Sequence, residues 1–132
     1  MIYMINKPLS AVEKFHKAYR ILINDRPTAD IDKELIKLRF NLMKEENEEY
    51  FEAARNNDIV EVADALGDML YILCGTIITH GFQNKIEEVF DEIQKSNMSK
   101  LGKDGKPIYR SDGKVMKGPN YFKPNIRAIL KK

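Results

Sequence analysis

Residues 31–79 read IDKELIKLRFNLMKEENEEYFEAARNNDIVEVADALGDMLYILCGTIIT and predict two long helices joined by a tight turn. Apolar residues recur at helical spacing over residues 31–55, which is typical of a helix with one buried face. The connection at residues 56–58 ends in Asp58, and an acidic residue three positions later completes a helix-start signal. The second helix, predicted over residues 59–79, is apolar almost all round, which indicates a central position in the fold.

Further elements are predicted on both sides of this pair. Ser10-Ala11-Val12-Glu13 fits a capping box and predicts a first helix that ends at a breaker over residues 24–28. A fourth helix is predicted at about residues 85–95. After it, residues 107–116 indicate a small β-hairpin around an Asp-Gly turn, and a short helix is expected at about residues 125–130. The predicted fold is all-α, a four-helix bundle with a basic C-terminal extension.

Length and composition favour one soluble domain. The chain has 132 residues, of which 43% are apolar and 32% are charged, as in ordinary globular proteins. We expect a single domain over residues 1–132, with a helical core at about residues 10–95 and the extension at about residues 96–132. The longest weakly polar run, residues 69–79, is shorter than the roughly 20 residues that a membrane helix needs, and the first residues do not resemble a signal peptide. We therefore expect neither a membrane protein nor an exported one.

Cysteine and histidine are too scarce for several kinds of site. Cys74 is the only cysteine, and His16 and His80 are the only histidines. These counts exclude a disulfide framework and a zinc centre built from cysteine or histidine. They are consistent with a reduced, cytoplasmic protein.

The charges are divided unevenly along the chain. Residues 1–94 hold 11 Lys/Arg against 18 Asp/Glu, a formal charge of −7, whereas residues 95–132 hold 11 Lys/Arg against 2 Asp, a formal charge of +9. Such asymmetry is typical of a tail that contacts a charged partner. A tail that only improves solubility is the alternative, and composition does not separate the two.

Two glutamates of the first long helix lie on its apolar side. At about 100° per residue, and with Leu35 at zero, Glu46 falls near +20° and Glu49 near −40°, both inside the apolar stripe. Glu45 lies at the edge of the stripe and Glu48 points away from it. Since an unpaired buried carboxylate is costly, Glu46 and Glu49 need a partner.

The second long helix supplies acidic groups at the matching height. Glu61, Asp64 and Asp68 share one face and are the only charged residues of that helix. A short turn makes the two helices antiparallel neighbours, so that residues at equal height have numbers that add to about 114. Glu46 should then face Asp68, and Glu49 should face Asp64 or Ala65.

Carboxylates brought together in this way repel one another unless a cation lies between them. Oxygen ligands without histidine or cysteine favour Mg²⁺, with Mn²⁺ as the close alternative. The predicted metal ligands are Glu46, Glu49, Asp64 and Asp68. The alternative is a plain acidic groove without a metal ion.

The basic extension offers groups that complement such a site. Mg²⁺ held by carboxylates typically also binds substrate phosphates. Lys95, Lys100 and Lys103 are the nearest cations after the fourth helix, and Asn97 adds a polar group at the same helix end. We expect these four residues to contact the phosphates of a substrate.

The acidic motifs resemble those of a known family. Glu45-Glu46-Asn47-Glu48-Glu49 matches the EExxE signature of the MazG-like all-α nucleoside triphosphate pyrophosphohydrolases, and Glu61-Val62-Ala63-Asp64 matches their ExxD signature. Asp68-Met69-Leu70-Tyr71 is similar to the D-L-L-Y stretch of the related phosphoribosyl-ATP pyrophosphohydrolases. The resemblance covers roughly residues 31–100.

This resemblance implies a function and an assembly. The reaction would be hydrolysis of a nucleoside triphosphate between its α- and β-phosphates, releasing a monophosphate and pyrophosphate. The carboxylates would hold Mg²⁺, and Glu45 or Glu61 would orient the attacking water as a candidate catalytic residue. The family pattern leaves open whether Glu61 or Asp68 completes the metal ligands. It also implies a homodimer or homotetramer.

Two other functions stay open from the sequence. One is hydrolysis of phosphoribosyl-ATP on the same scaffold, which the long extension makes less favoured. The other is a non-catalytic helical module whose basic tail binds nucleic acid, with Tyr109, Tyr121 and Phe122 as stacking groups. The acidic body would repel a polyanion and no recognition motif is visible, so we expect a nucleotide rather than a nucleic acid as the ligand.

Overall fold

The computed structural model describes residues 4–132, which form helices and loops. The helices, in chain order, are α1 (Asn6–Tyr19), α2 (Lys33–Arg55), α3 (Ile59–Thr79), α4 (Ile86–Met98) and α5 (Ile126–Leu130). No strand occurs in this part of the chain, so the all-α prediction is confirmed. The chain divides into two compact units, one that ends at Gln83 and one that begins at Asn84.

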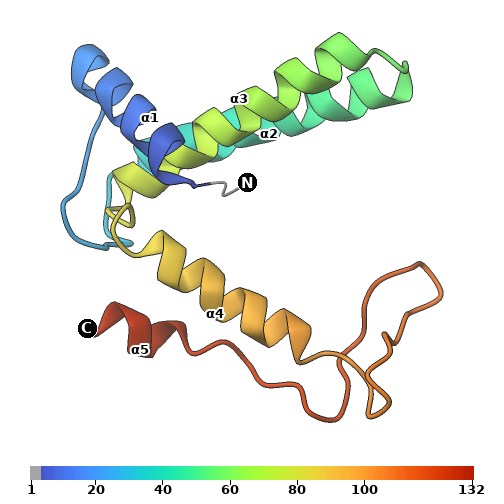
Figure 1. Cartoon of the computed structure of the whole chain (residues 1–132). Coiled ribbons are helices and arrows are strands. Elements are labelled where there is room, and N and C mark those ends of the chain that lie inside the picture. Colours follow the sequence, from blue (N-terminus) through green and yellow to red (C-terminus); the bar gives the residue numbers. More distant parts are fainter. Residues whose placement is uncertain (1–3) are drawn as a thin grey trace. The chain divides into compact units, whose positions relative to one another are not determined.

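The antiparallel pair α2 and α3 makes the largest helix contact of the first unit (Figure 1). Both helices begin at an aspartate cap, as N-terminal N–H groups require. The Asp32 carboxylate accepts from the N–H of Glu34 at 2.9 Å, and the Asp58 carboxylate accepts from the N–H of Glu61 at 3.1 Å. The cap at Asp32 starts α2 two residues later than predicted, whereas both ends of α3 agree with the prediction.

Helix α1 packs against α3 and begins earlier than predicted. The expected cap at Ser10 is wrong, because the helix already starts at Asn6. Pro8 is tolerated there since the N–H groups of a first turn have no partner within the helix. Leu9 and Val12 are buried, so packing of these two side chains holds the extra turn in place.

The end of α3 is closed by a Schellman motif. Gly81 has a φ of 77°, its N–H donates to the Ile78 carbonyl at 3.0 Å, and the Phe82 N–H donates to the Ile77 carbonyl at 2.9 Å. A Cβ on Gly81 would lie 2.1 Å from the carbonyl oxygen of Arg26. The predicted left-handed glycine cap is therefore confirmed, and it holds the loop before α2 close to the end of α3.

The second unit is organised around the C-terminal end of α4. This helix runs three residues beyond the predicted end at Lys95, and its Ser96 is buried. The Ser96 hydroxyl donates to the Phe122 carbonyl at 2.8 Å, and the Phe122 N–H donates to the Ser99 hydroxyl at 3.1 Å. Near the start of α4, Lys132 forms a 3.2 Å ion pair with Glu88. Figure 1 shows α5 beside α4 in this unit.

The predicted hairpin is reduced to one antiparallel bridge between Tyr109 and Val115. The Arg110 N–H donates to the Lys114 carbonyl at 2.7 Å, and Gly113 has a φ of 89°, as a tight turn requires. The flanking residues do not extend this pairing into strands. The side chains of Arg110 and Asp112 form an ion pair across the turn.

Helix α3 is apolar but mostly uncovered. It has a window of 18 residues with a mean hydropathy of 1.5, of which 28% is buried. By length and composition alone it is apolar enough to cross a membrane, a property shared by core helices of soluble proteins. Leu66, Leu70 and Leu73 are each more than 40% exposed and lie at helical spacing on one face. This stripe, here called the leucine face, is an apolar surface that the other helices of the first unit do not cover.

Candidate functional site

Three carboxylates meet between α2 and α3. One oxygen each from Glu46, Glu49 and Asp68 lies within 4.8 Å of the others. Glu46 and Asp68 are partly buried, and Glu49 is exposed. The two helices thus bring together three of the four predicted metal ligands, which we call the carboxylate cluster.

The electrostatics of the cluster favour a bound proton or cation. Burial, which is the largest cause, and the neighbouring Glu49, Asp68 and Asp64 together raise the pKa of Glu46 to about 7. The Oε2 atom of Glu46 is buried and has no hydrogen-bond partner. An orphaned carboxylate oxygen beside two other carboxylates is a donor set that fits a hard divalent cation. The residues therefore fit Mg²⁺ or Mn²⁺.

The other predicted acidic residues lie around this cluster. Asp64 is exposed and is not one of the three grouped ligands, although its charge acts on Glu46. Glu45 is also exposed. Glu61 lines a shallow depression of about 240 Å³ together with Glu49. Of the two candidate water-orienting residues, Glu61 thus shares a surface hollow with a member of the cluster.

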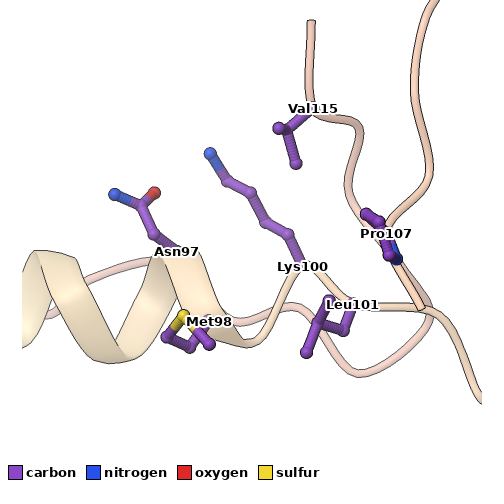
Figure 2. A pocket seen from close by; sticks show the side chains of 6 residues that line it. All are labelled: Asn97, Met98, Lys100, Leu101, Pro107 and Val115. Carbon is purple, nitrogen blue, oxygen red and sulfur yellow. The ribbon is translucent and has the colours of Figure 1, made fainter. Parts of the chain in front are cut away.

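The predicted phosphate-binding residues belong to the second unit. Asn97 and Lys100 line an open pocket of about 420 Å³, with Met98 and Leu101 from the same helix end. Figure 2 shows the Asn97 and Lys100 side chains pointing to the same side, with Val115 from the turn region near them. Lys95 and Lys103 are exposed and do not line this pocket.

A glycine lies close to the backbone of two residues that line this pocket. A Cβ on Gly118 would lie 2.2 Å from the carbonyl oxygen of Leu101 and 2.7 Å from that of Lys100. Only glycine allows two stretches of backbone to come this close. The segment after the turn is thereby held against the backbone that carries Lys100.

Sequence reasoning missed a buried arginine in the first unit. Arg39 of α2 is 6% exposed, and its guanidinium donates to the Ile72 carbonyl at 2.7 Å and to the Thr76 hydroxyl at 3.0 Å. His16 of α1 is 1% exposed, and its ring lies beside the Arg39 guanidinium at Gly75. Burial lowers the pKa of His16, and the Arg39 charge lowers it further against a hydrogen bond to the Leu22 carbonyl. A neutral histidine thus packs beside a charged arginine.

Comparisons with known proteins identify the relatives of this chain. Residues 12–97 match the model of the family described as phosphoribosyl-ATP pyrophosphohydrolase. A protein of Acanthamoeba polyphaga mimivirus, L479, is 31% identical over 75 residues, which cover 57% of this chain and 30% of that protein. The chain therefore spans less than a third of the length of this curated relative.

A solved structure of a proposed NTP pyrophosphohydrolase from Exiguobacterium sp. 255-15 is also similar. It is 26% identical, the match covers 94% of this chain and 91% of that one, and the TM-score is 0.45.

Proposed function

This chain belongs to the phosphoribosyl-ATP pyrophosphohydrolase family, and we propose that it is a Mg²⁺-dependent pyrophosphohydrolase that cleaves a nucleoside triphosphate between its α- and β-phosphates. A water oxygen becomes bonded to phosphorus, the bridging P–O bond breaks, and a nucleoside monophosphate and pyrophosphate are released. The observation that carries the proposal is the orphaned buried oxygen of Glu46 inside the carboxylate cluster.

Glu46, Glu49 and Asp68 would hold the cation, with Asp64 as the outer member of the set. A divalent cation bound there supplies charge neutralisation on phosphoryl oxygens and lowers the pKa of a coordinated water. The three carboxylates repel an unaccompanied triphosphate, so they make binding of the substrate depend on the cation.

Glu61 is the stronger candidate for orienting the attacking water. It shares the depression with Glu49, whereas Glu45 does not line it. An exposed carboxylate at this position accepts a proton from water and passes it to solvent. Asp58 fixes the backbone of Glu61 by accepting its N–H at 3.1 Å, which holds this residue at the start of α3.

Four residues of the second unit are proposed to contact phosphates of a bound nucleotide. Lys100 and Asn97 line one pocket and present donors to the same side, and Lys95 and Lys103 add charge nearby. Charge-assisted hydrogen bonds from such groups are the strong kind that phosphate recognition uses.

Phosphoribosyl-ATP is the second candidate substrate, because the matching family model carries that description. Both substrates contain the same triphosphate. They differ in what is attached to it, and the carboxylate cluster acts on the shared part.

We also propose a homodimer or homotetramer, in which a second copy covers the leucine face. An exposed apolar stripe on a helix is typical of an interface. The predicted four-helix bundle, the single domain and the cytoplasmic location belong to the same proposal.

The activity is tested by pyrophosphate release from a panel of nucleoside triphosphates and phosphoribosyl-ATP, with Mg²⁺ or with a chelator. We expect Mg²⁺-dependent release of pyrophosphate and monophosphate, and its loss in Glu49→Gln. Glu48→Gln is the matched control on the opposite side of α2 and should keep the activity. Release of single phosphate, or turnover in chelator, would contradict the proposed reaction.

A further inference from the structure

Arg39 is buried without an acidic partner. It takes part in none of the ion pairs between residues 4 and 132, and its guanidinium bonds only to a carbonyl and a hydroxyl of α3. Burying a charged group in this way costs free energy, and apolar residues of similar volume often stabilise a fold as well or better. Stability alone therefore does not explain an arginine at this position.

The two hydrogen bonds fix the position of α2 along α3. The Arg39 side chain bonds to Ile72 and Thr76, which are centred on residue 74. Arg39 of α2 therefore lies opposite residue 74 of the antiparallel α3, and these two residue numbers add to 113. Glu46 and Asp68, which meet in the carboxylate cluster, add to 114. The two sums differ by one, so the arginine and the cluster agree in helix register to within one residue.

A slip of the helices would break both features together. One residue of slip moves a side chain about 1.5 Å along the axis and about 100° around it. Arg39 lies seven residues before Glu46, which is about two helical turns, so both lie on the same side of α2. Apolar contacts tolerate small slips, whereas two directed hydrogen bonds do not.

Gly75 leaves the space that the guanidinium occupies. A Cβ at this position would lie 2.5 Å from the Nη2 atom of Arg39 and 2.8 Å from the Nε2 atom of His16. Glycine inside a helix is unfavourable compared with alanine, so the absence of a side chain here has a packing reason. His16 is anchored by its contact with the Leu22 carbonyl at 3.3 Å and packs against the same place from α1.

We infer that Arg39 is a positioning residue, whose hydrogen bonds to Ile72 and Thr76 across Gly75 fix the register of α2 on α3 and thereby set Glu46 and Glu49 opposite Asp68. Only the measurement of Mn²⁺ affinity described below rests on the proposed function. The register itself is a property of the helix pair.

The first test measures Mn²⁺ affinity by electron paramagnetic resonance in wild type, Arg39→Met and Gly75→Ala. Lys37→Met, an exposed residue of α2, is the matched control. We expect Arg39→Met to retain its helical circular dichroism and melting temperature, while the Mn²⁺ dissociation constant rises about tenfold or more, as for groups that orient metal ligands. Gly75→Ala keeps the guanidinium but displaces it and should weaken Mn²⁺ binding in the same way. Unchanged affinity in both variants would overturn the inference.

The second test measures the register without a metal. Spin labels on introduced cysteines at Asn41 and Ala63, both exposed, report the distance between α2 and α3 in protein diluted with unlabelled chain. Cys74 is buried and burial raises its pKa, so the introduced thiols react selectively. We expect one narrow distance in wild type and a shifted or broadened one in Gly75→Ala and Arg39→Met. If wild type binds no Mn²⁺, the proposed function fails, and an unaltered distance in both variants overturns the register role separately.

Discussion

Glu46 of α2 and Asp68 of α3 hold carboxylate oxygens within 4.8 Å of each other, and one Glu46 oxygen is buried without a partner. Two acidic groups at this distance repel each other in a partly desolvated site. The fold therefore stores a local destabilisation that a proton or a cation relieves. This relationship underlies the proposed chemistry and the predictions that follow.

The metal-free fold should lose stability as the pH rises. The pKa of Glu46 is about 7 in the fold, above its ordinary value of 4.5, so the fold favours the protonated form. The resulting contribution to stability is complete below about pH 4.5 and is lost as the pH rises through about 7. In chelator, the urea midpoint of wild type should fall over this window, whereas Glu46→Gln should lack this component. Equal pH dependence in the two proteins would contradict the raised pKa.

Lys100 should contribute to binding of the substrate more than to the chemical step. A charge-assisted hydrogen bond to phosphate is worth about 1.5–3 kcal/mol, so Lys100→Met should raise KM by about tenfold or more with a smaller effect on kcat. Lys106→Met is the control, because Lys106 does not line the pocket. Steady-state kinetics with Mg²⁺ separate the two parameters. An effect of equal size in both variants would show only a general charge effect.

Gly118→Ala should loosen the second unit. The added Cβ would meet two backbone carbonyls, which cannot move like a flexible side chain, and overpacking of this kind costs about 1–3 kcal/mol. Gly67→Ala is the control, since a Cβ there meets nothing within 4 Å, and in a helix interior it should stabilise by about 0.5–1 kcal/mol. Hydrogen exchange of residues 96–122 is the measurement. Unchanged protection in Gly118→Ala would contradict the tight backbone contact.

Charge on the leucine face should dissociate the proposed oligomer. Leu73 is 47% exposed on that face, and Leu73→Glu would place a carboxylate in the interface. Val60→Glu is the control, because Val60 is 70% exposed but lies about 120° away around the helix from Leu66. Light scattering should give a dimer or tetramer for wild type and the control, and a lower mass for Leu73→Glu. A monomeric wild type would contradict the assembly.

The helices were predictable where their signals are local. Asp58 and Gly81 determine both ends of α3, and each acts through its own backbone neighbours. The start of α1 was missed because burial of Leu9 outweighs the capping signal at Ser10. The hairpin prediction had a correct turn residue in Gly113, but an Asp-Gly turn does not fix how far the pairing continues.

The carboxylate cluster followed from helical angles and a short turn, because both set geometry over a few residues. Arg39 lies on the same apolar stripe, near +40° on the scale that placed Glu46 near +20°, so its burial had a signal. The groups that Arg39 contacts on α3 had no such signal, because a backbone carbonyl and a hydroxyl are uncharged and add nothing to the charge pattern of the sequence. The contact of Gly118 with Leu101 forms only when two segments that are separate in the sequence fold together, and no periodic sequence pattern indicates it.

The divalent-cation site between α2 and α3 is tested most directly by Mn²⁺ titration of wild type, Glu46→Gln and the control Glu48→Gln, followed by electron paramagnetic resonance. We predict saturable Mn²⁺ binding to wild type and to Glu48→Gln, competition by Mg²⁺, and affinity lowered by at least about tenfold in Glu46→Gln. Binding that is absent from wild type, or that is the same in Glu46→Gln, would show that the carboxylate cluster is an acidic groove and not a metal site.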